Sequence, residues 1–241
     1  MIEIKSLTKT FGSVEAVKNI SITVPKGEIF GLLGENGAGK TTTLRMLATM
    51  LKPTSGTATL NGYDIQKEPD RVRGELGILF GGESGLYNRL TVAENISYFG
   101  ELNNMDKKSI QNRIKYLAEV FEMGDYINRH AGKLSKGMRQ KAAFARAIVH
   151  DPNILLLDEP SAGLDVSAMI VIQDFIKMQH QLGKTIIFSS HSMVEVDKLC
   201  NRIAVIHKGS LIDTDTVENL KTKNKSDNLE EIFIRLVGEK Q

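Results

Sequence analysis

The sequence has few of the features that mark secreted, membrane-spanning or nucleic-acid-binding proteins. Its single cysteine, Cys200, excludes an internal disulfide framework and fits a reducing cytosol. With 31 basic and 29 acidic residues the net charge is +2, so no global field favours nucleic acid. No apolar run approaches the roughly 20 residues that a bilayer-spanning helix needs, and residues 1–5 lack the apolar block of a signal peptide. We therefore expect a protein that is soluble by itself, with any membrane role supplied by a partner.

The chain can nevertheless bury a proper core, because 41% of its 241 residues are hydrophobic. This length fits one α/β domain with subdivisions, or at most two small domains. Short apolar runs, typical of strands buried on both faces, alternate with helical patterns, which indicates a mostly parallel sheet. The runs lie at residues 28–33, 76–80, 153–157, 184–188 and 202–206.

Three other segments extend this core. Residues 2–24 alternate in polarity and end at Pro25-Lys26-Gly27, which predicts an antiparallel hairpin. Residues 57–60 predict a strand that enters a tight turn at Asn61-Gly62. From about residue 86 to 150 the pattern is helical, which suggests a helical subdomain inserted into the α/β core.

The helical segment carries recognisable start signals and apolar spacing. Thr91 is followed by Glu94 at the capping-box position. Apolar residues at positions 110, 114, 117 and 121 give the spacing of an amphipathic helix. Near the end of the chain, residues 221–225 are rich in lysine and are interpreted as a solvated linker, and residues 229–236 as an amphipathic helix. We therefore divide the chain into a domain at 1–220 and a linker with a C-terminal helix at 221–241.

The clearest chemical motif is Gly-Glu-Asn-Gly-Ala-Gly-Lys-Thr at residues 34–41. It fits G-x-x-x-x-G-K-[ST], the loop that wraps the phosphates of a nucleotide, and it lies between an apolar strand and a helix predicted at 42–50. Gly34, Gly37 and Gly39 can take positive φ, so that successive N–H groups can turn toward an anion. Lys40 would add charge near the β- and γ-phosphates and the Thr41 hydroxyl would ligate Mg²⁺. The alternative is an ordinary glycine-rich turn that caps a helix.

Two further candidates follow buried strands. Asp158 and Glu159 come directly after the strand at 153–157, where Asp158 would hold Mg²⁺ and Glu159 would deprotonate the attacking water. His191 follows the strand at 184–188 and could hydrogen-bond the γ-phosphate. Because ligands bind at the carboxyl ends of parallel strands, these residues and the glycine loop should meet in one site. A helix cap at Asp158-Glu159 and a structural histidine are the alternatives.

Residues 134–141 offer a second helix N-terminus for phosphate. Ser135 is a good N-cap and Gly137 permits close approach of the backbone. A helix end alone is worth about 0.3–1 kcal/mol on a surface, which is too little to hold ATP. An ordinary capped helix therefore explains this segment equally well from the residues alone.

Taken in order, the motifs at 34–41, 134–141, 154–160, 161–165 and His191 resemble those of ABC-transporter ATP-binding subunits. The resemblance spans almost the whole chain and implies a P-loop NTPase (RecA-like) core with an N-terminal antiparallel β subdomain and an inserted α-helical subdomain. It implies a homodimer that sandwiches ATP and Mg²⁺ head to tail, and a separately encoded transmembrane permease that holds it at the inner face of the cell membrane. Catalysis would fall to Lys40, Glu159 and His191, and the metal to Thr41 and Asp158. The nucleotide would contact Phe11 (at the adenine), Gly34, Asn36, Gly37, Ala38, Gly39, Lys40, Thr41, Thr42, Ser135 and Gly137.

Within the family, Leu-Ser-Lys-Gly-Met-Arg-Gln at 134–140 and the tail at 229–236 look most like the exporter subfamily that includes sodium-extrusion (Nat-type) and drug-export ATPases. Two positions depart from the family pattern. Near Gly81 and Gly82 the usual glutamine is absent and Glu83 stands close by. Met138 replaces the usual signature glutamine, so one polar contact to the opposing nucleotide is missing.

Two rival interpretations belong to other functional classes. A non-transport ABC ATPase would act on DNA, ribosomes or cluster assembly, but those on nucleic acid usually carry long coiled coils or two fused cassettes, and this chain has neither. A P-loop kinase or GTPase is the other rival. The guanine-reading pattern Asn-Lys-x-Asp occurs only at 224–227, in a polar tail without a preceding apolar strand. We therefore expect a transport ATPase without a nucleic-acid partner.

Overall fold

The computed structural model describes residues 1–80 and 85–238. Ten strands lie within these residues and form two sheets. They are β1 (Ile2–Phe11), β2 (Val14–Val24), β3 (Ile29–Leu33), β4 (Ser55–Leu60), β5 (Tyr63–Asp64), β6 (Leu76–Leu79), β7 (Ile154–Asp158), β8 (Thr185–Ser190), β9 (Arg202–His207) and β10 (Ser210–Thr216). The helices are α1 (Lys40–Leu47), α2 (Pro69–Gly74), α3 (Val92–Leu102), α4 (Lys107–Val120), α5 (Lys136–Ala147), α6 (Val166–Gln181), α7 (Met193–Leu199), α8 (Val217–Asn224), α9 (Leu229–Gly238) and the short 3₁₀ turn η1 (Ala131–Lys133).

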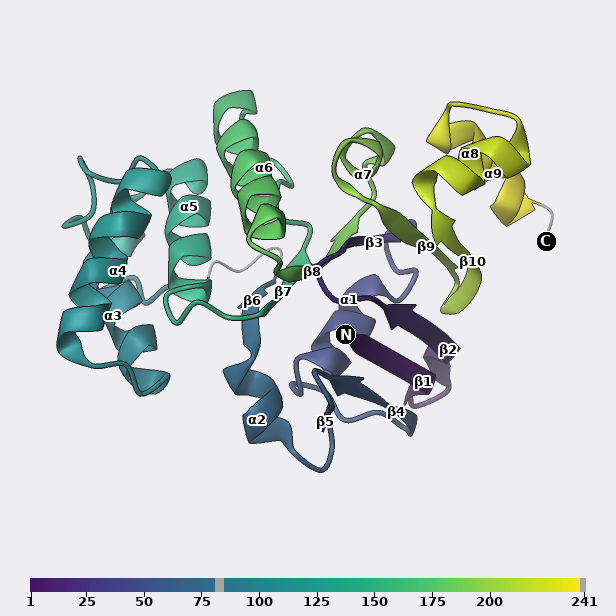
Figure 1. The fold of residues 1–241 in the computed structure, drawn as a ribbon, viewed down its shortest axis with the longest axis horizontal. Coiled ribbons are helices and arrows are strands. Elements are labelled where there is room, and N and C mark those ends of the chain that lie inside the picture. The colour runs from purple at the N-terminus through teal and green to yellow at the C-terminus, as the bar shows by residue number, and fades with distance from the viewer. Residues whose placement is uncertain (81–84, 239–241) are drawn as a thin grey trace.

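The larger sheet has six strands in the order β10-β9-β3-β8-β7-β6. Its strands run parallel except for β10, which is antiparallel to β9 at one edge. The five residues of β7 are all buried, and successive side chains face opposite sides of the sheet, as period-2 geometry requires. This is the parallel sheet that the apolar runs predict, and it brings the ends of β3, β7 and β8 to one edge (Figure 1).

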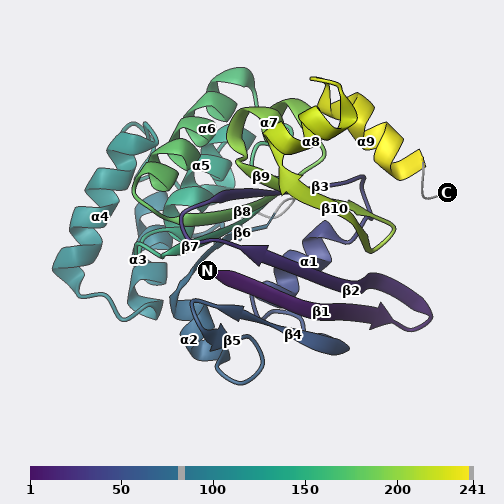
Figure 2. The same ribbon diagram turned by 45° about the vertical axis from the view of Figure 1, so that its right-hand side comes forward.

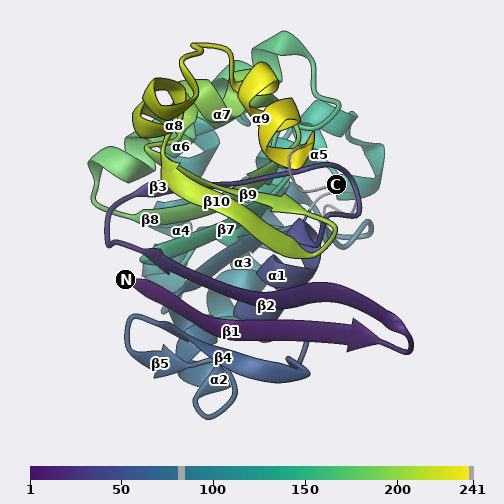
Figure 3. The same ribbon diagram turned by 90° about the vertical axis from the view of Figure 1, so that its right-hand side faces the viewer.

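Two apolar cores cover the two faces of this sheet. On one face, α1 packs between the six-stranded sheet and the N-terminal antiparallel sheet (Figures 2 and 3). On the other face, α5, α6 and α7 form the covering layer, and α8 and α9 extend it. Helix α1 thus has apolar neighbours on two sides, which fixes the N-terminal end of the helix against the strand that precedes it.

The N-terminal sheet has four antiparallel strands in the order β2-β1-β4-β5. The predicted hairpin is β1 paired with β2, and the predicted turn is made by Asn61 and Gly62, both with positive φ (49° and 90°). Two positive-φ residues match the tight turn that joins two antiparallel strands. Both expectations are confirmed.

Helices α3, α4 and α5 follow one another between β6 and β7 and lie at the end of the molecule opposite α9 (Figure 1). The capping box at the start of α3 is present in full: Thr91 Oγ1 accepts from the Glu94 N–H at 3.2 Å, and Glu94 Oε2 accepts from the Thr91 N–H at 2.7 Å. No helix within residues 1–80 and 85–238 combines the length and the apolar character needed to cross a membrane.

The prediction of a solvated linker at 221–225 is wrong. Helix α8 begins after the N-cap Thr216 and continues through this lysine-rich segment to Asn224. The buried Leu220 anchors the helix on the main core, and Lys221 pairs with Asp197 of α7 at 2.6 Å. Lys223 is exposed, Lys221 lies half-buried toward α7, and the predicted boundary at 220/221 falls inside α8.

Candidate active site

The glycine loop joins β3 to α1, as the motif requires. An ideal Cβ on Gly34 would lie 2.3 Å from the Ile206 carbonyl oxygen, and one on Gly39 would lie 2.5 Å from the Ala16 carbonyl oxygen. The sequence predicts positive φ at all three loop glycines, but only Gly37 (81°) and Gly39 (107°) have it. Glycine is therefore required at position 34 because the backbone packs too closely there to leave room for a side chain. The first turn of α1 has no side-chain cap, which leaves its N–H groups available to an anion.

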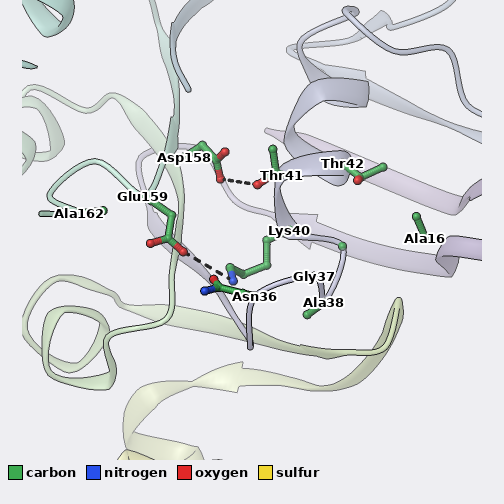
Figure 4. A pocket seen from close by; sticks show the side chains of 11 residues that line it. Ala16, Asn36, Gly37, Ala38, Lys40, Thr41, Thr42, Asp158, Glu159 and Ala162 are labelled. Atoms are coloured by element: carbon green, nitrogen blue, oxygen red, sulfur yellow. Dashed lines mark hydrogen bonds and ion pairs between the residues drawn. The ribbon is translucent and has the colours of Figure 1, made fainter. Parts of the chain in front are cut away.

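Lys40 is the first residue of α1 and its side chain is almost fully buried. Its Nζ donates to the Gly34 carbonyl at 2.7 Å and to the Glu35 carbonyl at 3.0 Å, and it lies 3.7 Å from Glu159 Oε1 (Figure 4). Burial lowers the pKa of Lys40, and the carboxylates of Glu159 and Asp158 oppose this shift. A phosphate would be a stronger partner than the two carbonyls, because it carries full charge.

Asp158, the last residue of β7, meets α1 through a hydrogen bond. Thr41 Oγ1 donates to Asp158 Oδ1 at 3.0 Å, and Ser189 Oγ of β8 donates to the same oxygen at 2.5 Å. Asp158 is buried, so these two hydroxyls satisfy a carboxylate that would otherwise be costly to bury. Ser189 is a residue that the sequence analysis missed, although its place at the end of a strand next to the Asp158 strand could have suggested it.

Glu159 and His191 form a close pair. His191 Nδ1 lies 2.6 Å from Glu159 Oε2. Glu159 adopts positive φ (49°), and its N–H contacts both the carbonyl and the hydroxyl oxygen of Ser189 at 3.1 Å. The unusual φ turns the chain sharply after β7 and so aims the Glu159 side chain at Lys40 rather than along the strand. The three sites predicted at strand ends therefore converge.

Lys40, Thr41, Asp158 and Glu159 border a cavity of about 360 Å³, which is within the usual size of small-ligand pockets. Figure 4 shows the Glu159 carboxylate pointing toward the Lys40 ammonium and the Asp158 carboxylate pointing toward the Thr41 hydroxyl. Two lining residues, Ala16 and Ala162, were not predicted. The complete lining is Ala16, Asn36, Gly37, Ala38, Gly39, Lys40, Thr41, Thr42, Asp158, Glu159 and Ala162.

The predicted site residues that do not line this cavity are Phe11, Gly34, Ser135, Gly137 and His191, although His191 contacts Glu159, which does. Phe11 is 49% exposed at the end of β1, and the Lys9 ammonium lies 5.1 Å from the centre of its ring. Ser135 caps α5 by accepting from the Met138 N–H at 3.3 Å. Gly137 lies beside Ala168 at the start of α6. The N-terminus of α5 therefore does not contribute Ser135 or Gly137 to the cavity at the glycine loop of its own chain.

The residues present suit a magnesium ion that is bound mainly by a substrate. Thr41 and Asp158 place a hydroxyl and a carboxylate 3.0 Å apart at the phosphate-binding loop. Among the described residues there is no group of three His, Cys, Asp or Glu side chains that could hold a metal. Mg²⁺ commonly takes one or two protein ligands and completes its shell with waters and phosphate oxygens, which matches this sparse site. Glu83, considered as a substitute for the usual glutamine, lies outside the described residues.

Comparison with known proteins gives consistent matches. The model of the ABC transporter family matches residues 17–162. The ABC transporter ATP-binding protein NatA of Bacillus subtilis is 48% identical over 221 residues, which cover 92% of this chain and 90% of NatA. A solved ATP-binding subunit of an ABC transporter has a TM-score of 0.91 at 24% identity, covering 98% of this chain and 99% of the other, which shows the fold. The ATP-binding cassette MJ0796, solved as a dimer in a post-hydrolysis state with ADP and Pi, has a TM-score of 0.82 at 25% identity over 90% of this chain and 98% of its own.

Proposed function

Because this chain belongs to the ABC transporter family, we propose that two copies of it clamp two MgATP molecules head to tail and drive a separately encoded membrane permease. The chain is an ATPase with the P-loop NTPase fold, and ATP and Mg²⁺ are its ligands. The proposal adds the composite site, the role of each side chain, the permease and the cargo. A non-transport role on DNA, ribosomes or cluster assembly is not favoured by these relatives.

One observation supports a nucleotide site composed of residues from two copies of the chain. The cavity at the glycine loop supplies Lys40, Asp158 and Glu159, but neither Ser135 nor Gly137 lines it. The N–H groups at the start of α5 therefore have no phosphate in their own chain. A second copy in head-to-tail orientation would bring them over the phosphates held by the first copy, and the dimer would contain two equal sites.

In this site, each side chain has a distinct task. Lys40 would leave the Gly34 and Glu35 carbonyls to bind the phosphates, with Thr41 and Asp158 holding Mg²⁺, which neutralises charge on the phosphates when bound. Glu159 would accept a proton from the attacking water as its oxygen bonds to the γ-phosphorus and ADP leaves. His191, 2.6 Å from Glu159, orients that carboxylate and can donate to the γ-phosphate.

We expect Lys40→Ala to weaken ATP binding by about 10- to 100-fold, since a hydrogen bond from a charged group contributes roughly 1.5–3 kcal/mol. Titration calorimetry with ATP and Mg²⁺ would measure the change. The exposed Lys52, on the turn after α1, provides a matched control, because Lys52→Ala removes the same charge away from the cavity. Equal affinities for the two variants would contradict the role given to Lys40.

Phe11 offers a spectroscopic test of adenine stacking. The sequence contains no tryptophan, so Phe11→Trp would introduce a single tryptophan at the proposed base site, and its emission can be excited selectively at the long-wavelength edge of its absorption, where tyrosine absorbs little. We expect its emission to change with ATP but not with tripolyphosphate, which has no base to stack. Phe11→Ala should weaken ATP binding by about fivefold or more, because stacking contributes roughly 1–3 kcal/mol per base. An unchanged emission spectrum at saturating ATP would remove Phe11 from the site.

We propose that the permease docks at a second cavity, which has a volume of about 630 Å³. Its lining includes the apolar Phe99, Leu102 and Met105. It also includes Arg73 and Arg146, and the Arg146 guanidinium lies 4.4 Å from the centre of the Phe99 ring. An amphipathic segment of a membrane protein could pack its apolar face here. Docking at this cavity would hold the ATPase at the cytoplasmic face of the cell membrane.

We propose sodium ions as the exported cargo. Residues 134–140 resemble the exporter subfamily that includes sodium-extrusion and drug-export ATPases, the sequence at 80–87 looks similar to the sodium-extrusion branch, and the chain is 48% identical to NatA. The test is reconstitution of this chain with the permease encoded beside it in inverted vesicles. ATP should then drive ²²Na⁺ uptake into the vesicles, and chain without permease should not. ATP turnover without sodium movement, together with movement of a drug, would reassign the cargo to the drug-export branch.

A further inference from the structure

Glu195 is a buried carboxylate outside the cavity that contacts two segments next to the reacting residues. These are Ser161 in the turn after β7, and Ser190 at the end of β8, where the turn that carries His191 begins. Glu195 is 6% exposed in the first turn of α7. The Ser190 hydroxyl donates to its Oε2 at 2.8 Å, and the Ser161 hydroxyl donates to its Oε1. Each carboxylate oxygen therefore receives one hydrogen bond from a different turn.

The position of Glu195 in the sequence suggests a simpler role, which the contacts contradict. Ser192 is the N-cap of α7 and Glu195 is three residues on, the arrangement of a capping box. In a capping box the glutamate would accept from the N–H of the cap residue. The Ser192 N–H instead donates to Ser190 Oγ at 3.0 Å, and the Glu195 carboxylate faces the two turns. Helix capping does not account for its direction.

The two turns that meet at Glu195 hold the reacting pair. Ser161 follows Glu159 by two residues, and Ser190 directly precedes His191. At the strand ends, the Glu159 N–H already contacts Ser189. Glu195 links the same two segments a second time, through Ser161 and Ser190. The Glu159–His191 contact of 2.6 Å is therefore held by the Glu159–Ser189 contact and by the Glu195 hydrogen bonds.

The turn after β7 also makes a hydrogen bond with helix α5. Gln140 Nε2 of α5 donates to the Pro160 carbonyl at 2.8 Å. Helix α5 is the helix whose N-terminus would face the nucleotide of the partner copy. Through Pro160 and Ser161, the turn therefore connects α5 to Glu195 by contiguous hydrogen bonds.

We propose that Glu195 is a positioning residue that sets the distance and direction between Glu159 and His191. This inference rests on the proposed roles of these two residues. Without the carboxylate, Ser161 and Ser190 would lose their shared acceptor and the two turns could move apart. A displacement of about 1 Å at a reacting group can cost on the order of 100-fold in rate. ATP binding should be spared, because Glu195, Ser161 and Ser190 do not line the cavity.

The central test is Glu195→Gln, which preserves shape but removes the charge and one acceptor. We expect kcat to fall on the order of 10- to 100-fold with KM for ATP changed by about twofold or less. The matched control is Asp197→Asn on the same helix, which removes a carboxylate that pairs with Lys221 of α8, away from Ser161 and Ser190. Its kcat should match that of the unmodified chain.

The serines give a second set of variants. Ser161→Ala should lower kcat in the same way, and Ser161→Thr, which retains a hydroxyl, should restore it. Combining Ser161→Ala with Glu195→Gln should lower kcat by less than the product of the two single effects, since both remove one interaction. These variants keep the test informative if Glu195→Gln does not fold.

Two results would overturn the inference. One is a kcat for folded Glu195→Gln or Ser161→Ala equal to that of Asp197→Asn. The other is a loss of kcat in Glu195→Gln and Ser161→Ala that is fully explained by a smaller folded fraction, as measured by thermal unfolding. In that case Ser161→Thr would also fail to restore kcat. Glu159→Gln is assayed in parallel: if it retains full turnover, the proposed site is wrong, whereas if it alone loses turnover, only the role of Glu195 is wrong.

Discussion

Glu159→Gln is expected to lower ATP turnover on the order of 10²–10⁴-fold while leaving ATP binding intact. Glutamine has nearly the same shape as glutamate, so the contacts of the backbone N–H with Ser189 should persist. What is lost is a group that can accept the proton of the attacking water. Because Glu159 Oε1 lies 3.7 Å from Lys40 Nζ, removing the charge should not weaken, and could strengthen, the hold of the site on anionic ATP.

The measurement is phosphate release at saturating ATP, alongside calorimetry for binding and light scattering for mass. ATP-loaded Glu159→Gln should accumulate as a dimer, since opening follows hydrolysis in the proposed cycle. Glu35→Gln is the matched control: it makes the same change on the exposed side of the glycine loop, 3.8 Å from His207 and away from His191. Turnover by Glu159→Gln at the rate of this control would remove Glu159 from the role of base.

Much of this arrangement could be predicted because its causes are local. The residues 154–157 form an unbroken apolar run, as a strand buried on both faces of the sheet needs, and Asp158 ends the strand. The capping box at Thr91 and Glu94 depends on residues three apart. The glycine loop is specified by eight consecutive residues. Each pattern is completed within one segment, so the sequence alone is sufficient.

What could not be predicted depends on contacts between distant segments. Ser189 reaches Asp158 across 31 positions, and Ser161 reaches Glu195 across 34. A serine at a strand end carries no sign of which carboxylate it will meet. The prediction of a linker at 221–225 is wrong for the same reason. The helix there is stabilised by the burial of Leu220 in the core and by the ion pair between Lys221 and Asp197, which lies on another helix. The separation of Ser135 from the cavity likewise became visible only in three dimensions.

Gly137→Asp is expected to abolish ATP-dependent dimer formation and to lower turnover on the order of 10²–10³-fold, because like charges placed together cost several kcal/mol. The new carboxylate would stand at the start of α5, where the proposed dimer places the phosphates of the partner's ATP. Binding of ATP to the chain's own glycine loop should be unchanged, since Gly137 does not line that cavity. Sedimentation of the variant in the Glu159→Gln background, with ATP, would measure the dimer directly.

The control is Gly137→Ala, which the chain itself tolerates. A Cβ at this position would lie 3.4 Å from the Ala168 Cβ and 3.6 Å from Asp165 Oδ2, so alanine fits without a clash. Gly137→Ala should therefore fold normally and reduce dimer formation far less than aspartate does. If ATP-loaded Gly137→Asp still forms dimers as Gly137→Ala does, the α5 N-terminus does not face a phosphate. Any contact between the two copies would then have to use a surface other than the Ser135–Gly137 segment.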